Sequence, residues 1–210
     1  MTQSEQIKCQ NLADEIADEV QISQALYNAI ATTKREIFVP ISAHAYSVNA
    51  HPIEGGQWIS SPLSVAKMTK ALECEDVDNV LEVGCGSGYQ AAILSKLAHR
   101  VFSVERIQKL AMEAKKRFES LGIKNVHVRF DDGNLGWAKY APYERIILSC
   151  GCESVPDRLF SQLKVGGILV APVGKANQQN IVKFTKLADG NIKEEIFDEC
   201  LFVPLLAGTE

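Results

Sequence analysis

The sequence lacks the features that would indicate a membrane protein or a general nucleic-acid-binding protein. No apolar run approaches 18 residues, and the amino-terminal MTQSEQIKCQ has no cationic start followed by an apolar core. We therefore expect no membrane span and no signal peptide, and we place the protein in the cytoplasm. Acidic residues (26) outnumber lysine and arginine (22), for a net charge of −4. Because nucleic-acid-binding proteins normally carry a basic face, we expect no nucleic-acid partner.

Clusters of cysteine and histidine are also missing. Cys150-Gly-Cys152 is the one close cysteine pair, and the other cysteines and the four histidines show no ligand spacing. We expect no metal site and no disulfide scaffold, so the cysteines should behave as small apolar side chains. Internal repeats, low-complexity tracts and Ser/Gly linkers are absent as well. With 46% hydrophobic residues, the 210-residue chain is expected to form a single domain over residues 1–210.

The first part of the chain has a helical pattern. Apolar residues recur near the helix period between Ile7 and Ile30, until KREIFVP (34–40) ends the pattern. After a less regular segment, Ser61-Pro62 predicts a new helix, because serine can cap a helix and proline suits its first turn. Residues 1–78 are thus predicted to form a helical N-terminal extension.

From residue 79 onward, short apolar runs alternate with helical stretches. This alternation predicts a parallel sheet covered on both faces, and residues 79–210 form the predicted α/β core. The end of the chain differs, since a turn at 188–191 separates two strand-like segments and predicts an antiparallel hairpin. The five expected parallel strands are 79–83, 100–104, 126–130, 145–149 and 167–171, the helical stretches lie near 88–97, 107–121 and 154–163, and the hairpin strands are 180–187 and 194–203.

The stretch VLEVGCGSGY (80–89) predicts a strand that runs into a ligand-binding loop. Gly84, Gly86 and Gly88 follow the strand, at the sheet edge where open α/β folds bind ligands. The dinucleotide pattern G-x-G-x-x-G requires a glycine at position 89, where this chain has Tyr89. The loop therefore weakens the prediction of a dinucleotide without abolishing it.

Acidic residues at three strand ends favour a different nucleotide. Glu82 would repel phosphate but could attract an ammonium group. Glu105 ends the next strand, where an acid can accept both ribose hydroxyls. Asp132-Gly133 is placed to hydrogen-bond an adenine amino group. A ligand with an amino-acid tail and no phosphate fits both Tyr89 and Glu82, and Glu105 and Asp132 suit its ribose and adenine. S-adenosylmethionine is therefore the expected cofactor, and a methyl group is the transferred group.

Several segments together resemble one family, the protein-L-isoaspartate (D-aspartate) O-methyltransferases. The resemblance implies a Rossmann-like class I methyltransferase fold with a mostly parallel seven-stranded sheet. It also implies S-adenosylmethionine as methyl donor, and isoaspartyl residues in damaged proteins as acceptor for protein repair. The match runs in order from about residue 31 to the end, and its most specific pieces are GGQWIS (55–60), SVERI (103–107), APVG (171–174) and FVPL (202–205).

The resemblance also assigns site residues. The family's G-Q-T-I-S motif carries the active-site serine, which matches Ser60. Its segment covers the cofactor and adds Gln57 and Ile59 to the cofactor-binding set. Trp58, Ser60 and Val173 are assigned to the substrate. The full expected cofactor-binding set is Gln57, Ile59, Ser60, Glu82, Gly84, Gly86, Gly88, Glu105, Asp132 and Gly133.

The chain departs from the family pattern around the acceptor. Trp58 replaces the usual threonine, Ser149–Cys152 replaces a segment with Thr, Ala and Pro, and Asp131 replaces a glycine. Trp58 could instead be a core aromatic, and Ser60 could simply cap the helix that begins near Pro62.

Other functions remain open at this level. They are a methyltransferase with a different acceptor, a binder that has lost acceptor recognition, a nucleotide-dependent oxidoreductase and a nucleic-acid methyltransferase. The last would show an Asn/Asp-Pro-Pro-aromatic tetrad after the fourth strand, where SCGC (149–152) stands.

A carboxylate acceptor would require no general base. Carboxyl groups have reference pKa values near 4, so the acceptor is already ionised at neutral pH. Catalysis would then rest on positioning and on removing water from the acceptor. The sequence does not fix the oligomeric state, although a monomer is plausible.

Overall fold

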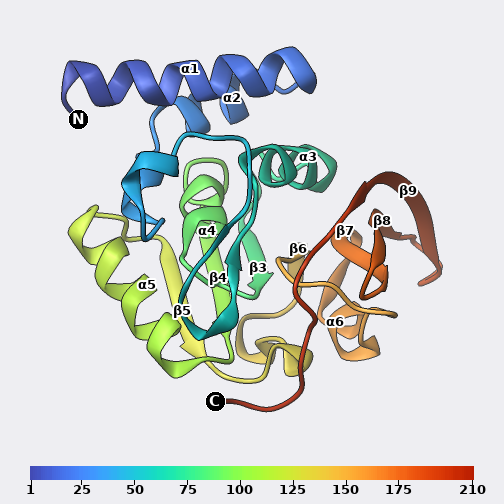
Figure 1. Cartoon of the computed structure of the whole chain (residues 1–210). Coiled ribbons are helices and arrows are strands. Elements are labelled where there is room, and N and C mark those ends of the chain that lie inside the picture. The colour runs from blue at the N-terminus through green and yellow to red at the C-terminus, as the bar shows by residue number, and fades with distance from the viewer.

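A seven-stranded sheet forms the centre of the molecule. The computed structural model describes the backbone of residues 1–210 and the side chains of all of them except Ala43. The strand order is β5-β4-β3-β6-β7-β8-β9, parallel from β5 to β7 and antiparallel at β8 and β9 (Figure 1). The prediction of a mostly parallel sheet with an antiparallel hairpin is confirmed. The strands are β3 (Asn79–Val83), β4 (Arg100–Glu105), β5 (Val126–Phe130), β6 (Tyr143–Leu148), β7 (Leu163–Lys175), β8 (Gln178–Lys186) and β9 (Ile192–Cys200).

Helices cover both faces of this sheet. One hydrophobic cluster joins residues of the first five helices to one face, and the other cluster joins α6 to the opposite face. Side chains of β3 alternate between them, with Val80 in the first cluster and Leu81 in the second, as a strand buried on both faces requires. In Figure 1, α1 lies across the top of the molecule. The helices are α1 (Gln3–Glu19), α2 (Gln24–Ala31), α3 (Pro62–Leu72), α4 (Tyr89–Leu94), α5 (Gln108–Ser120) and α6 (Asp157–Ser161).

The order of winding reverses between β3 and β6. The chain passes from β3 to β4 and β5, then returns to pair β6 with the other side of β3. Val83 at the end of β3 stands opposite both Val104 and Leu148. The segments that follow β3, β4 and β6 therefore leave the sheet at one edge, where ligands of open α/β folds bind.

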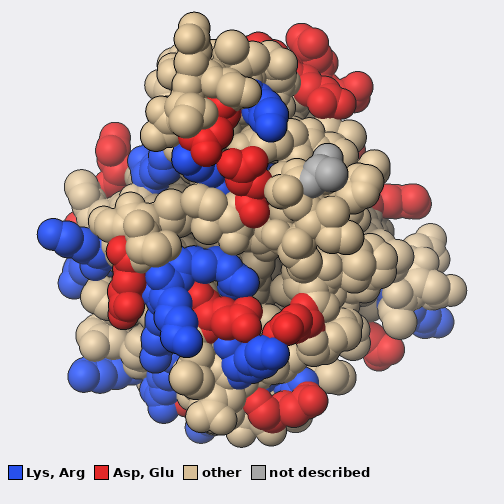
Figure 2. Space-filling model, turned by 60° about the vertical axis from the view of Figure 1, so that its left-hand side comes forward, with Lys and Arg blue, Asp and Glu red and all other residues tan. Residues whose placement is uncertain are grey.

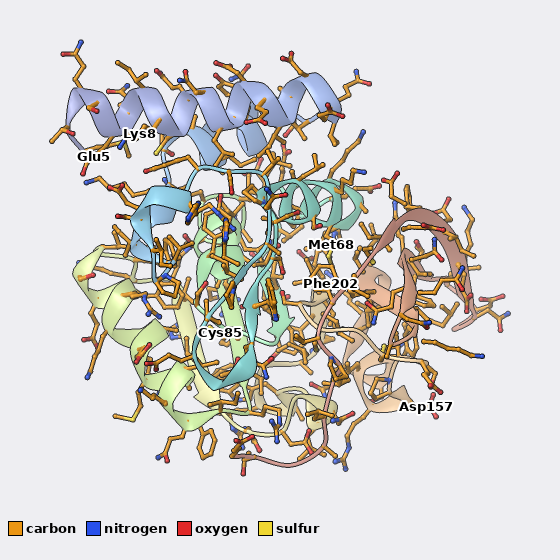
Figure 3. The ribbon with its side chains drawn as sticks, in the orientation of Figure 1. Glu5, Lys8, Met68, Cys85, Asp157 and Phe202 are labelled. Atoms are coloured by element: carbon orange, nitrogen blue, oxygen red, sulfur yellow. The ribbon has the colours of Figure 1, made fainter. Side chains whose placement is uncertain are left out.

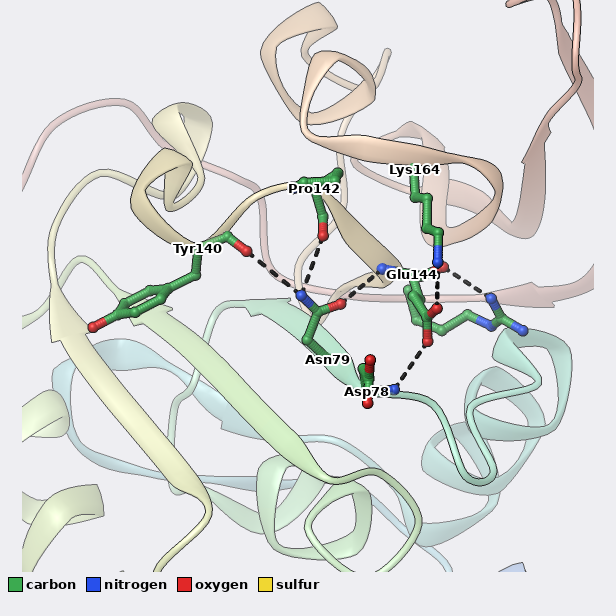
Figure 4. A network of polar contacts seen from close by, with 7 residues as sticks. Asp78, Asn79, Tyr140, Pro142, Glu144 and Lys164 are labelled. Carbon is green, nitrogen blue, oxygen red and sulfur yellow. Dashed lines mark hydrogen bonds and ion pairs between the residues drawn. The ribbon is translucent and has the colours of Figure 1, made fainter.

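A polar network joins β3 and β6 where the two strands begin, at the edge of the sheet away from the ligand edge (Figure 4). The Asn79 amide donates to the Pro142 carbonyl (3.1 Å) and accepts from the Glu144 N–H (2.9 Å). Glu144 accepts from the Asp78 N–H (2.9 Å) and pairs with Lys164 (2.7 Å). These bonds hold the register of the two central strands and hence the relative position of the segments at the ligand edge.

The hairpin prediction was wrong at its end. The predicted strand 194–203 continues only to Cys200, and residues 201–210 leave the sheet as a segment that we call the C-terminal strap. The strap runs down the molecule from β9 in Figure 1. Gly151 donates to the Val203 carbonyl (2.8 Å) and accepts from the Leu205 N–H (2.7 Å). The strap therefore pairs with the chain just after β6, at the ligand edge.

Strand β9 forms one outer edge of the sheet. It pairs only with β8 among the described strands, and that pairing shifts register between Asn180 and Val182. Its exposed residues include three carboxylates, Glu194, Asp198 and Glu199, and Glu195 beside them is half-buried. Among the described helices, none is both long and apolar enough to cross a membrane.

Candidate active site

A cleft open to solvent lies at the ligand edge of the sheet, and the space in and above it amounts to about 760 Å³. Segments distant in sequence meet there, and Figure 3 labels one residue in each of two of them, Cys85 and Phe202. The cleft is lined by residues 57–60, the loop after β3, the ends of β4 and β6, and the strap. Of the predicted site residues, Gln57, Trp58, Ile59, Ser60, Gly84, Gly86, Glu105 and Gly133 line it.

The glycine loop (residues 84–88) forms the floor of the cleft. Gly88 has a φ of 91°, and a Cβ added there would lie 2.8 Å from Phe118 Cζ, so no larger residue fits. Gly88 therefore supports the loop from behind, while Gly84 and Gly86 line the cleft itself. Tyr89, which replaces the dinucleotide glycine, is buried and also lines the cleft.

Glu105 connects the end of β4 to the glycine loop. Its side chain is buried and lines the cleft. One carboxylate oxygen accepts from the Gly86 N–H (2.7 Å) and the other from the Ile107 N–H (2.9 Å). Each oxygen has a further lone pair, so the carboxylate can also accept from a ligand. The position predicted for ribose binding is therefore at the cleft.

Glu82 is not placed as predicted. Its side chain is completely buried within the sheet and is not among the residues that line the cleft. Ser103 and Ser149 donate hydroxyl hydrogen bonds to its two oxygens. Burial raises the pKa of this carboxyl to about 8, against the lowering effect of the two serines. A largely neutral carboxyl behind the loop does not attract an ammonium group. It supports the strands that carry the loop.

Asp132 also differs from its predicted role. Gly133 lines the cleft, but the Asp132 carboxylate accepts from the Asn134 N–H (2.8 Å) and from the Gly208 N–H of the strap (2.7 Å). Burial raises the pKa of this carboxyl, but the bonds from Gly208 and Asn134 outweigh burial and bring it below its usual value. The carboxylate thus anchors the strap beside the cleft, and Asp132, unlike Glu105, is not among the residues that line the cleft.

The elbow (residues 55–60) brings the family motif to the cleft. Gly55 and Gly56 both have positive φ, 70° and 65°, which explains the paired glycines. The short strand β2 (Trp58–Ile59) then pairs with β1 (His51–Pro52). Ile59 is buried, whereas Trp58 is 53% exposed and lines the cleft. The alternative of Trp58 as a core aromatic is therefore wrong.

Two adjacent serines at the end of the elbow have separate positions. Ser61 caps α3, because its hydroxyl accepts from the Ser64 N–H (3.0 Å). Ser60 lines the cleft, and its hydroxyl makes no hydrogen bond within the described part of the chain. The Ser60 carbonyl accepts from Arg35 Nη2 (2.8 Å). Ser60 is thus not the helix cap, and its hydroxyl is available to a ligand.

Val173 lies outside the cleft. It pairs with Asn180 of β8, bridges to Cys152, and packs against the second hydrophobic cluster. Among the residues after β6, Ser149 and Cys150 line the cleft instead. Burial raises the pKa of the Cys150 thiol, which stays protonated at neutral pH.

Several cleft residues carried no sequence prediction of a site role. They include Cys85, Tyr89, Gln90, Arg106 and Cys150, together with Val203 to Leu206 of the strap. The FVPL motif (202–205) singled out four of the ten strap residues, but nothing in the local pattern indicated that the strap reaches the cleft. Its hydrogen bonds to Gly151 and Asp132 are the contacts that bring it there.

Comparisons with known sequences agree on one family. A family model described as "Protein-L-isoaspartate(D-aspartate) O-methyltransferase (PCMT)" matches residues 7–210. A protein-L-isoaspartate O-methyltransferase of Helicobacter pylori (strain J99) is 46% identical over 206 residues, which is 97% of this chain and 99% of that protein. The enzyme of the same name from Maricaulis maris is 46% identical and covers 86% of this chain and 85% of its own length.

Solved structures show the same architecture. A protein-L-isoaspartate O-methyltransferase, 28% identical, superposes with a TM-score of 0.84 over 92% of this chain, which spans 64% of that longer chain. A structure from Plasmodium falciparum is 19% identical with a TM-score of 0.83, over 94% of this chain and 98% of that one. That structure contains bound S-adenosyl-L-homocysteine. At that identity, the second likeness supports the fold alone.

Proposed function

Because the chain belongs to the protein-L-isoaspartate(D-aspartate) O-methyltransferase family, we propose that its cleft is where this S-adenosylmethionine-dependent enzyme methylates isoaspartyl residues of damaged proteins. One observation supports the proposal that this cleft is the active site. The elbow places the unbonded hydroxyl of Ser60 in the same cleft as the glycine loop and the buried Glu105 carboxylate. Donor and acceptor can therefore meet there.

The cleft residues fit the cofactor. Gly84 and Gly86 leave room for a ligand to approach the backbone, and Glu105 offers a carboxylate suited to two ribose hydroxyls. Gln57, Ile59 and the strap also line the cleft. When bound there, S-adenosylmethionine supplies an electrophilic methyl group on a sulfonium.

The acceptor side of the cleft needs to orient a carboxylate and to exclude water. We assign the orienting role to the Ser60 hydroxyl, which can donate to one carboxylate oxygen. Trp58 stands beside it, half exposed at the cleft, and can cover the peptide that carries the isoaspartate. An ionised carboxylate needs no proton removed, so the role of the protein is alignment and desolvation.

The assay that tests this function measures radiolabelled methyl transfer from S-adenosylmethionine to a short isoaspartyl peptide. Its matched control is the same peptide with a normal aspartyl linkage at that position. We expect methylation of the first and none of the second. Equal labelling of both peptides, or labelling of neither by protein that binds the cofactor, would contradict the proposed acceptor and favour a different acceptor or a non-catalytic binder.

Narrower expectations accompany this function. We propose that residues 1–210 form one domain, since the N-terminal helices and the sheet contribute to one hydrophobic cluster. We further propose a cytoplasmic monomer that acts without nucleic acid. On the face shown in Figure 2, Lys and Arg side chains are interspersed with Asp and Glu, which supports the last point for that face. Size-exclusion chromatography with light scattering tests the monomer, since a dimer would contradict it.

A further inference from the structure

Arg35 is a buried charge without a counter-ion. It begins the short helix η1 (Arg35–Ile37), within the KREIFVP segment, and its side chain has no exposed surface. Only Nη2 makes a hydrogen bond, to the Ser60 carbonyl (2.8 Å). In the described part of the chain, Nε and Nη1 have no partner, and none of the ion pairs includes Arg35. Such an arrangement is costly unless something compensates the charge.

The guanidinium lies directly behind the wall of the cleft. Its central carbon is 4.4 Å from the centre of the Tyr89 ring, a cation–π contact, and the Tyr89 ring packs edge-on against Phe38 (5.6 Å). Tyr89 and Ser60 both line the cleft. Arg35 therefore contacts one residue from the cofactor side and one from the acceptor side, and its charge lies one residue behind each.

Other ionisable groups near this place do not supply the missing anion. His51 has its pKa lowered by burial first and then by the Arg35 charge, so it is neutral at pH 7. The ionisable groups that line the cleft are Glu105, whose oxygens bond the backbone, Arg106, Tyr89, Cys85 and Cys150. Burial raises the pKa of Tyr89 and of both thiols, which are neutral as well.

We propose that Arg35 is a positioning residue that holds the Ser60 elbow through its backbone and whose unpaired charge favours the ionised acceptor carboxylate at the Ser60 hydroxyl. The inference rests on the proposed function, because it takes that carboxylate as the missing anion. A dry cleft disfavours an ionised carboxyl group, and a positive charge behind the wall opposes this effect. Arg35 thus keeps the acceptor reactive at pH values near neutrality.

The test compares Arg35→Gln with Arg35→Lys. Glutamine can still donate to the Ser60 carbonyl but carries no charge, whereas lysine keeps the charge and loses the planar fork. For Arg35→Gln we expect KM for the isoaspartyl peptide to rise about tenfold, with cofactor Kd within about threefold of wild type. The acidic limb of the kcat–pH profile, which reports ionisation in the enzyme–substrate complex, should move up by about one pH unit, and Arg35→Lys should keep it at the wild-type position.

A merely structural role gives a different result. It would change cofactor Kd, thermal stability and KM together and leave the acidic limb in place, which would overturn the inference. A measurement on the wild type guards against failure of the variants to fold. We expect the wild-type protein to bind the isoaspartyl peptide at least about tenfold more tightly than the same peptide with a carboxamide in place of the acceptor carboxylate. Equal binding of the two peptides would overturn the inference. If the wild type methylates the peptide but shows none of these effects, the proposed function stands and only the role of Arg35 falls.

Discussion

Replacing Ser60 and Ser61 separately by alanine tests the proposed active site most directly. The two residues are neighbours in sequence and have the same side chain, but only Ser61 caps α3 and only Ser60 lines the cleft. Ser61→Ala removes the bond to the Ser64 N–H, and loss of such a cap lowers the free energy of unfolding by about 1 kcal/mol. Ser60→Ala removes a hydroxyl with no partner in the described part of the chain, so the free energy of unfolding should change by less than about 0.5 kcal/mol.

For catalysis, we expect Ser60→Ala to have the larger effect and Ser61→Ala the smaller one. A hydrogen bond to a charged group contributes about 1.5–3 kcal/mol, so Ser60→Ala should lower turnover on the isoaspartyl peptide by about tenfold to a hundredfold. Cofactor affinity should stay within about threefold, because the defect lies in orientation of the acceptor. Ser61→Ala should keep turnover within about twofold at a temperature where it is folded.

Urea unfolding, calorimetric titration of the cofactor and the methyl-transfer assay together measure these effects. The reasoning is refuted if Ser60→Ala retains full turnover, or if Ser61→Ala loses as much turnover as Ser60→Ala. Either result would mean that the elbow supports the fold and that the serine hydroxyl has no role in orienting the acceptor.

Three further predictions concern the cofactor, the acceptor and pH. Glu105→Ala should weaken S-adenosylmethionine binding by about 1.5–3 kcal/mol in calorimetry, while the exposed control Glu119→Ala should not, and an unchanged Kd in a folded Glu105→Ala protein would exclude the ribose contact. Trp58→Thr should keep or raise turnover on the isoaspartyl peptide. If Trp58→Thr instead loses turnover, Trp58 takes part in acceptor recognition. The Glu82 carboxyl, whose pKa burial raises to about 8, binds a proton in the folded state that the unfolded chain has already lost between about pH 5 and 8. The free energy of unfolding should therefore fall as pH rises through that window, by up to about 1 kcal/mol per unit, and urea titrations of Glu82→Gln should lack this slope.

Local patterns in the sequence predicted the elements well. The strand predicted at 79–83 and that at 126–130 coincide with β3 and β5, and Ser61-Pro62 begins α3 as expected. Alternation, caps and turns act between residues that are close in sequence, so the chain itself reveals them. The same alternation placed the glycine loop after the carboxyl end of a parallel strand, where open α/β folds bind ligands, whereas the strand order came from the structure.

Contacts between distant segments were the part that the sequence could not predict. From the sequence, Asp132 is predicted to bind the cofactor. In the structure, its carboxylate accepts a hydrogen bond from Gly208 of the strap, 76 residues later in the chain. Glu82 reads as exposed to the ligand until the pairing of β3 with β4 and β6 encloses it between Ser103 and Ser149. In both cases an acid at the end of a strand was satisfied within the protein. The local sequence pattern gives the position of such a group along the chain, but it does not give the partner that binds the group in the folded protein.

The acidic outer edge of β9 has a consequence for how the protein behaves among its substrates. Damaged proteins expose extended segments, and an open strand edge is a template on which such segments can add and aggregate. Along β9, Glu194, Glu195, Asp198 and Glu199 surround the exposed Ile196 and Phe197, and the register shift in the β8 pairing disrupts the regular ladder behind them. An incoming strand would have to bury or oppose these charges. The enzyme can thus work on misfolded chains through its cleft while its sheet resists co-precipitation with them.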